Sequence, residues 1–188
     1  GENKMKEDWR ISDRVLHIQK SAIHEMTRLS KEVDDVAFLS WAKPTSDTPE
    51  HIKEAAVTAI KKGLVGGYSE NAGLLELRKE IVKKLKIDNN IDADESQLLV
   101  TVGAVEGLSS ATMALINHGD EVILPCPYWV SYSDIVKLNG GIPVEVKTSI
   151  ETDFKMTAEQ LETAITPKTK MIWYSSPCNP SGSVYSEQ

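Results

Sequence analysis

Apolar and polar positions alternate in a regular order over the second half of the chain. Four short apolar runs predict β-strands, because they are rich in β-branched and aliphatic residues and end at turn formers. They cover 97–103, 121–125, 142–147 and 169–176. The segments between them have helical periodicity and cover 104–117, 128–141 and 157–166. This order predicts parallel strands joined by right-handed crossovers, in a three-layer α/β/α fold with a mostly parallel sheet.

The first half of the chain has helical patterns without a clear strand order. Residues 1–20 show little periodicity and are interpreted as an N-terminal arm, followed by a predicted helix over 21–33. Residues 36–41 form an apolar strand or extended segment, and two prolines interrupt the pattern after it. Further helices are predicted from Pro49 to Gly63 and over 74–90, separated by a loop. We expect residues 1–46 to form the arm and the start of a small domain, and 47–188 to form the first part of a large domain.

Composition narrows the functional classes. The 188 residues carry a formal net charge of -7, which argues against nucleic-acid binding. No apolar run approaches the roughly 20 residues needed to span a bilayer, and the polar first residues show no secretory signal. The two cysteines, Cys126 and Cys178, form neither a disulfide framework nor a zinc motif. We expect a cytoplasmic protein without a metal site.

Candidate chemistry lies at the predicted strand ends, because ligands of parallel sheets gather at the carboxyl ends of the strands. The first such end runs through Gly103 into a helix, whose first backbone N–H groups can receive an anion. This junction is common, and by itself it is more often an ordinary turn. It contains neither the dinucleotide fingerprint nor a P-loop.

The second and third strand ends carry an aromatic pair and an amide. Tyr128 and Trp129 open a helix, where an aromatic ring either packs in the core or offers a flat face to a planar ligand. Asn179 precedes Pro180 in a turn that can aim the amide at a ligand oxygen, although a plain turn is the commoner case. Together the three ends suit a flat, phosphorylated cofactor.

The chain resembles the fold-type I pyridoxal-phosphate aminotransferases of the aspartate aminotransferase class. The resemblance covers most of the chain from about Val36, in the family's order and spacing. It rests on the collinear segments "DTPEHIKEA", "GGYSENAGLLELRKEI", "LLVTVGAVEGL", "GDEVILPCPYWVSY", "ITPKTK" and "SSPCNPSGSVYS".

The resemblance implies roles for residues at the three strand ends. The turn of Gly103, Ala104 and Val105 would bind the phosphate of pyridoxal 5'-phosphate through backbone N–H groups. Trp129 would stack on the pyridine ring, and Asn179 would donate to its phenolic oxygen, which is how proteins commonly tune a cofactor.

Two further positions are implied in the first half of the chain. Tyr68 would reach the phosphate of the neighbouring subunit's cofactor, so that a homodimer would share its sites. Ala42 stands where relatives have a glycine whose N–H meets the substrate carboxylate, and its added methyl group puts the substrate fit in question. The cis peptides common in the family would fall at Cys126-Pro127 and Asn179-Pro180.

The resemblance places the lysine that forms the Schiff base downstream of Gln188. We therefore assign no catalytic residue here, since lysines such as Lys137 and Lys170 match no such motif. The later strands of the family's sheet insert between the earlier ones, so we expect this chain to be a part of a longer enzyme. The strands at 97–103 and 169–176 would then not be neighbours.

The implied activity is transfer of an amino group between an amino acid, aspartate by default, and a 2-oxo acid. The fragment alone is expected to be inactive. One alternative is a non-catalytic, ligand-sensing module with an aminotransferase-like fold. Another is a flavodoxin-like nucleotide or flavin binder, which fits the strand–helix alternation but not the collinear segments.

Overall fold

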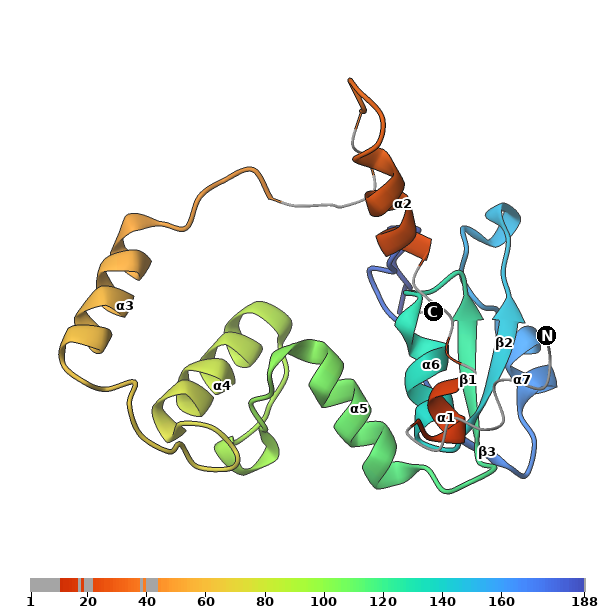
Figure 1. Cartoon of the computed structure of the whole chain (residues 1–188). Helices are drawn as coiled ribbons and strands as arrows, with labels where there is room; N and C mark the ends of the chain where they lie inside the picture. The colour runs from red at the N-terminus through yellow and green to blue at the C-terminus, as the bar shows by residue number, and fades with distance from the viewer. Residues whose placement is uncertain (1–10, 17, 19–21, 38, 40–43, 188) are drawn as a thin grey trace. The chain divides into compact units, whose positions relative to one another are not determined.

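A computed structural model describes residues 11–16, 18, 22–37, 39 and 44–187 of the chain (Figure 1). The chain divides into two compact units. One unit combines Gly1–Ser21 with Gly103–Gln188, and the other comprises Ala22–Val102.

A three-stranded parallel sheet forms the centre of the first unit. Its strands are β1 (Glu121–Cys126), β2 (Ile142–Lys147) and β3 (Thr169–Ile172), in the spatial order β2-β1-β3. All pairs are parallel, as the sequence pattern predicts, and the β1–β3 pairing has an irregularity between Glu121 and Val122. The three aliphatic residues at the centre of β1, Val122, Ile123 and Leu124, are fully buried. Such a two-sided apolar run is typical of a strand covered by helices on both faces.

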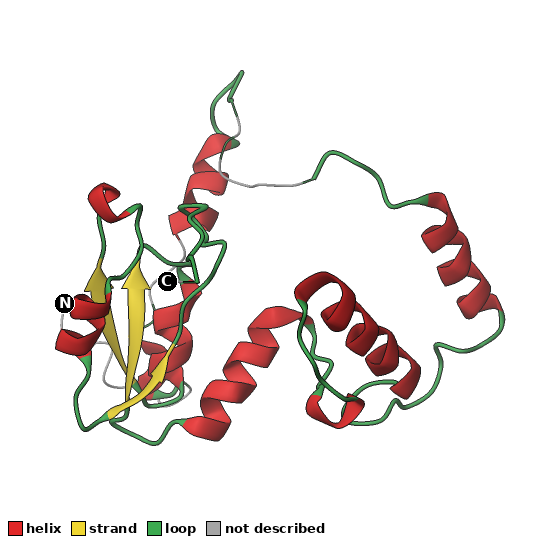
Figure 2. Ribbon diagram, turned by 180° about the vertical axis from the view of Figure 1, so that it is seen from behind, coloured by secondary structure: helices red, strands yellow, loops and turns green. Residues whose placement is uncertain are grey.

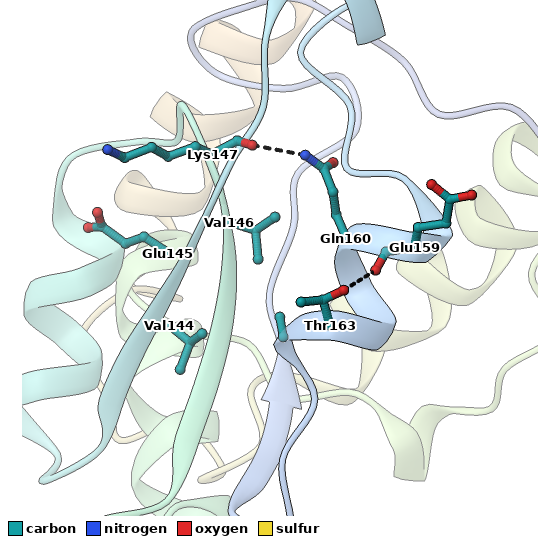
Figure 3. A pocket seen from close by; sticks show the side chains of 8 residues that line it. Val144, Glu145, Val146, Lys147, Glu159, Gln160 and Thr163 are labelled. Carbon is teal, nitrogen blue, oxygen red and sulfur yellow. Dashed lines mark hydrogen bonds between the residues drawn. The ribbon is translucent and has the colours of Figure 1, made fainter.

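Helices cover both faces of this sheet (Figure 2). The connecting elements are α5 (Gly103–Leu115), α6 (Ser131–Leu138), the short 3-10 helix η2 (Ile150–Thr152) and α7 (Ala158–Ala164), with α1 (Asp13–Leu16) near the N-terminus. Ile135 and Val136 of α6 join Val122 and Leu124 in one buried cluster. Helix α7 instead packs on β2, on the side of Val144 and Val146 (Figure 3). Because Leu124 pairs with Glu145, these valines point to the opposite face, which confirms the predicted α/β/α layering.

The strand predicted at 97–103 is wrong. A 3-10 helix, η1 (Glu95–Gln97), precedes this segment, and residues 98–101 join no sheet. The backbone is extended at Leu98, and the N–H of Val100 donates to the carbonyl oxygen of Ala72 at 3.0 Å. An apolar, extended segment becomes a β-strand only when a neighbouring strand completes its backbone hydrogen bonds. Here the carbonyl of Ala72, in a loop, accepts the bond that a neighbouring strand would otherwise accept.

The second unit contains α2 (Ala22–Ser30), α3 (Glu50–Lys61) and α4 (Leu75–Asn89). Helix α3 begins after Pro49, which occupies the N-cap and not the first helical position, and Gly63 ends it with φ +71°. The N–H groups of Gly63 and Leu64 return to Ile60 and Ala59, which is a Schellman closure. The left-handed Asn90 ends α4.

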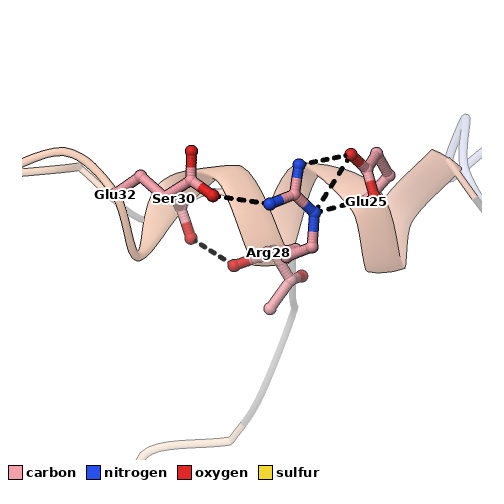
Figure 4. A network of polar contacts seen from close by, with 5 residues as sticks. Glu25, Arg28, Ser30 and Glu32 are labelled. Carbon is pink, nitrogen blue, oxygen red and sulfur yellow. Dashed lines mark hydrogen bonds and ion pairs between the residues drawn. The ribbon is translucent and has the colours of Figure 1, made fainter.

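The apolar segment predicted at 36–41 lies partly outside the described residues. Its described members, Val36, Ala37 and Leu39, belong to no strand. In α2, Arg28 pairs with Glu25 at 2.8 Å and with Glu32 at 2.5 Å (Figure 4). Spacings of three and four residues bring these charges together on the exposed surface, where solvent screens such pairs and leaves them little stabilising effect.

Candidate functional site

The turns after β1 and β3 lie against each other at the carboxyl edge of the sheet. The two strands are adjacent and parallel, and the thiol of Cys178 lies 3.5 Å from the carbonyl oxygen of Pro127. The peptide bonds Cys126-Pro127 and Asn179-Pro180 are cis, as the resemblance implies, and Ser176-Pro177 is cis as well. The structure therefore brings together two of the three turns that the sequence singles out.

Trp129 belongs to a cluster of aromatic rings that includes Tyr132 and Trp173. The ring of Tyr132 stacks on Trp173 with centroids 4.7 Å apart, and Trp173 is 8% exposed. The half-buried ring of Trp129 meets the edge of Tyr132 at 5.7 Å and 71°. Edge-to-face contacts of this kind favour a defined ring orientation. Trp129 is therefore held on the protein side by a ring that is itself fixed in the core.

Tyr128, beside Trp129, is tied to the neighbouring strand. Its hydroxyl group donates a short hydrogen bond to Oε1 of Glu145 on β2. Burial, together with this bond to a carboxylate, raises the pKa of Tyr128 to about 12. The turn after β1 is therefore fastened to β2 as well as to the turn after β3.

The turn after β3 closes into a small hairpin around Asn179. The N–H of Cys178 donates to the carbonyl of Ser183 at 2.9 Å, and the N–H of Gly182 returns to the carbonyl of Cys178 at 2.7 Å. Gly182 has φ +75°, which glycine adopts without steric cost. Asn179 lies at the exposed tip of this hairpin, where its amide is accessible to a ligand.

The first predicted turn opens α5. Gly103 is the first residue of this helix and has φ +75°, and Ala104 and Val105 belong to its first turn. Leu108 packs on the core cluster, so the helix start lies five residues, or about 7.5 Å, further along the axis. Residues 116–120 connect the C-terminal end of α5 to the amino end of β1. The N-terminal end of α5 is therefore the end of this helix that points away from the amino edge of the sheet.

Two predicted site residues are not among the residues of the first unit that the structure describes. Tyr68 belongs to the second unit, in a fully exposed loop. Ala42 lies outside the described residues. The structure accordingly brings the turns of Trp129 and Asn179 together, places the Gly103 turn in the same unit, and does not test the other two positions.

Described residues of the first unit line at least two hollows. One is lined by aromatic and turn residues at the carboxyl edge, among them Tyr128, Tyr132 and Cys178. The other is an open groove between β2 and α7 (Figure 3), where Gln160 donates to the carbonyl of Lys147 at 3.1 Å. The residues that line this groove include Glu145, Lys147 and Glu159, and none of them is a site residue that the sequence predicts.

Among the described residues, no group of three or more His, Cys, Asp or Glu side chains could hold a metal ion. Both cysteines are free thiols, and burial raises the pKa of Cys126. None of the described helices is long and apolar enough to cross a membrane.

Sequence reasoning missed two supporting residues. Tyr132 follows Trp129 by three positions at a helix start, a spacing that could have indicated contact. Tyr185 contacts Tyr174 with ring centroids 5.3 Å apart and accepts a hydrogen bond from the N–H of Met156. No local pattern relates Tyr185 to Met156, because the two residues are 29 positions apart, with α7 and β3 between them.

The fold defines an α/β protein with a parallel sheet, and the paired turns at the carboxyl edge are its candidate site. Comparison with known proteins identifies its family. Residues 35–188 match the family "Aminotransferase class I and II". The aspartate/prephenate aminotransferase of Nitrosomonas europaea is 42% identical over 94% of this chain and 45% of its own length. The aspartate aminotransferase of Geobacillus stearothermophilus is 40% identical over 95% of this chain and 46% of its own.

Solved structures agree with the sequence comparison. A crystal structure of the aspartate aminotransferase from Rhizobium meliloti superposes with a TM-score of 0.88 at 39% identity, covering 94% of this chain and 45% of that one. The Thermus thermophilus aspartate aminotransferase with maleate gives 0.88 at 38% identity, with coverages of 94% and 47%. The chain belongs to the class I and II aminotransferases, and it spans less than half the length of these relatives.

Proposed function

We propose that the full-length protein containing this chain transfers an amino group between an amino acid and a 2-oxo acid, with pyridoxal phosphate as cofactor. Aspartate is the proposed default amino acid, because relatives that share about 40% identity are named aspartate aminotransferases. The cofactor, when bound, supplies the electron sink for chemistry at the α-carbon of the amino acid.

Open space at the start of α5 supports the proposed phosphate role of Gly103, Ala104 and Val105. A side-chain carbon added at Gly103 would meet no atom within 4 Å, so the start of α5 has open space for an anionic group. Helix starts favour anions because their N–H groups point along the axis and the helix dipole is positive there. Gly103, Ala104 and Val105 would hold the phosphate by their backbone.

Trp129 and Asn179 would hold the ring. The indole of Trp129, braced by Tyr132, would offer a flat face to the pyridine ring. The exposed amide of Asn179 would donate to the phenolic oxygen, and a donor to an oxygen anion favours its deprotonated form. These residues bind and orient the cofactor, and no proton-transfer group is assigned among them.

The remaining roles concern the substrate and a second subunit. Ala42 would present its backbone N–H to the substrate carboxylate, and Tyr68 would contact the phosphate in a neighbouring subunit. This arrangement requires a homodimer with shared sites. The proposed location is the cytoplasm, and the proposed domain boundary is at residues 46–47.

The observation that carries this proposal is the contact between the turns of Trp129 and Asn179 at adjacent strand ends, in a chain of this family. Purified full-length protein should bind pyridoxal phosphate, and its absorbance should change on addition of aspartate and revert with 2-oxoglutarate. Absence of any spectral change with a panel of amino acids would contradict the proposed reaction.

Variants of Asn179 and Trp129 can show whether these residues bind the cofactor. Asn179→Ala and Trp129→Ala should each weaken cofactor binding, with Asn117→Ala as the matched control, since Asn117 is equally exposed but lies after α5. A hydrogen bond to a charged group is worth about 1.5–3 kcal/mol, which corresponds to a loss of at least about ten-fold for Asn179→Ala.

A further inference from the structure

The segment that follows Asn179 is held at one residue in particular, Tyr185. It lies six positions beyond Asn179, outside the residues to which the resemblance assigns a role. Three separate contacts converge on it, from the hairpin, from the end of β3 and from the loop before α7. These contacts bear on the position of the hairpin tip that carries Asn179.

The first contact closes the open end of the hairpin. The N–H of Tyr185 donates to Oγ of Ser176 at 3.1 Å, and the N–H of Cys178 donates to the carbonyl of Ser183 at 2.9 Å. Ser176 lies two residues before Cys178, and Tyr185 lies two residues after Ser183. Tyr185 is therefore opposite Ser176, and the bonds between the two sides enclose the tip that carries Asn179.

The second contact joins the hairpin to the sheet. The ring of Tyr185 meets Tyr174 at 5.3 Å and 70°, in an edge-to-face arrangement. Tyr174 directly follows Trp173, whose N–H donates to the carbonyl of Ile123 and whose side chain belongs to the core. The aromatic contact thus links the returning side of the hairpin to the end of β3.

The third contact comes from a loop with an unusual backbone. Asp153 and Phe154 both have φ +53°, a left-handed conformation that is uncommon for residues other than glycine. Two residues later, the N–H of Met156 donates to the hydroxyl oxygen of Tyr185 at 2.8 Å. Nζ of Lys155 also lies 3.4 Å from the carbonyl oxygen of Val184. The loop between β2 and α7 is therefore bound to the chain just beyond the hairpin.

We propose that Tyr185 is a positioning residue for Asn179: its hydroxyl group and ring hold the hairpin so that the amide keeps a fixed place beside the Trp129 turn. The proposal rests on the proposed function, since Asn179 is placed against the cofactor's phenolic oxygen. Tyr185 itself touches no reacting atom. Its effect would pass through the hairpin bonds between Tyr185 and Ser176 and between Cys178 and Ser183.

The test compares Tyr185→Phe with Tyr174→Phe in the full-length protein. Both changes remove one phenol hydroxyl from the same pair of rings. Only Tyr185→Phe removes the acceptor of the Met156 N–H, because no hydrogen bond of the Tyr174 hydroxyl occurs within the part of the chain that the structure describes. The readout is the pH midpoint of the absorbance change of bound pyridoxal phosphate.

The midpoint should rise when Asn179 is lost or displaced. A donor to the phenolic oxygen favours the deprotonated cofactor, so Asn179→Ala should raise the midpoint by about one to two pH units. Tyr185→Phe should move it in the same direction by a smaller amount, about a third of a unit or more, and Tyr174→Phe should leave it unchanged. A Tyr185→Phe protein with a lower melting temperature but the wild-type midpoint would overturn the positioning role.

A second measurement is independent of the cofactor. Amide hydrogen exchange of the cofactor-free protein should become faster at Met156 and at Cys178 in Tyr185→Phe and stay unchanged in Tyr174→Phe. Unchanged exchange at both positions would also refute the proposal. If instead the wild-type protein binds no pyridoxal phosphate, the proposed function fails, while the exchange result still decides whether Tyr185 holds the hairpin.

Discussion

The thiol of Cys178 and the carbonyl oxygen of Pro127 are 3.5 Å apart and join two turns that are 51 positions apart in the sequence. A thiol is a weak donor, so this contact contributes at most about 1 kcal/mol by itself. Its importance lies in its position, because Cys178 precedes Asn179 and Pro127 lies two residues before Trp129.

Replacing this thiol should affect cofactor binding more than stability. Cys178→Ala removes the donor, and we expect about two- to five-fold weaker binding of pyridoxal phosphate, since a net hydrogen bond is worth about 0.5–1 kcal/mol. Cys178→Ser retains a donor and should remain within about two-fold of the wild type. Equal dissociation constants for Ala, Ser and wild type would show that the contact does not orient the turns.

Glycine substitutions should separate conformational strain from steric overlap. Gly73 has φ +91°, and an added side-chain carbon would lie 2.6 Å from Cβ of Val100. Gly73→Ala therefore combines backbone strain with overlap and should cost about 2–4 kcal/mol. Gly103→Ala, with φ +75° and open space, should cost only about 1–2 kcal/mol.

The control for these changes is Gly67→Ala, because Gly67 has no positive φ and no atom within 4 Å of an added carbon. The order of melting temperatures should be Gly67→Ala highest, then Gly103→Ala, then Gly73→Ala. A Gly73→Ala protein as stable as Gly67→Ala would contradict the close approach to Val100.

Arg78 should be the most important charged side chain of the second unit. Its side chain is only 11% exposed, and it donates to the carbonyls of Gly73 and Glu95 as well as to Glu70. Arg78→Lys keeps the charge but cannot reach all three acceptors, so we expect a loss of about 2–3 kcal/mol in the free energy of unfolding.

Lys83 provides the comparison for Arg78. It pairs with Glu80 while 64% exposed, and such surface pairs are worth about 0–1 kcal/mol. Lys83→Met should therefore change stability little when measured under the same denaturant conditions. A larger effect for Lys83→Met than for Arg78→Lys would refute this ranking.

The centre of β1 should tolerate truncation poorly. Leu124 is 0% exposed, and Leu124→Ala should cost about 2–5 kcal/mol through lost burial and the remaining cavity. Ile150, which is 74% exposed in η2, supplies an aliphatic control, and Ile150→Ala should cost less than about 0.5 kcal/mol. Thermal unfolding of both variants would measure the difference.

Tyr128 should make stability depend on alkaline pH. Its pKa is raised to about 12 by burial and by the hydrogen bond to Glu145, above the ordinary value near 10. Because the folded state favours the protonated phenol, the contribution is fully present below pH about 10 and is lost as the pH rises to about 12.

Glu145→Gln removes the charge that opposes ionisation, so the Tyr128 pKa should fall toward its ordinary value. Titration of tyrosine absorbance, with Tyr128→Phe to assign the signal, would measure it. Glu159→Gln, on α7 and away from Tyr128, is the control and should leave the titration unchanged. An unchanged Tyr128 pKa in Glu145→Gln would show that burial alone sets it.

The sequence by itself determined the local elements and their order. The alternation of apolar runs and helical segments was sufficient for three of the four predicted strands, because β1 is buried on both faces and β2 and β3 pair with it directly. Capping patterns were also readable, as at Thr157, which accepts from the N–H of Gln160. These signals are local, since they depend on residues within one or two turns of each other.

Only the tertiary structure decided which turns meet. Residues 98–102 have the apolar pattern of a strand but bond to Ala72, because pairing depends on a neighbour that no local pattern specifies. The contact of Cys178 with Pro127 and that of Tyr185 with Met156 likewise arise from the order of the strands, because the partners are 51 and 29 positions apart in the sequence. The sequence pointed to Trp129 and Asn179 separately, and the parallel pairing of β1 with β3 placed their turns side by side.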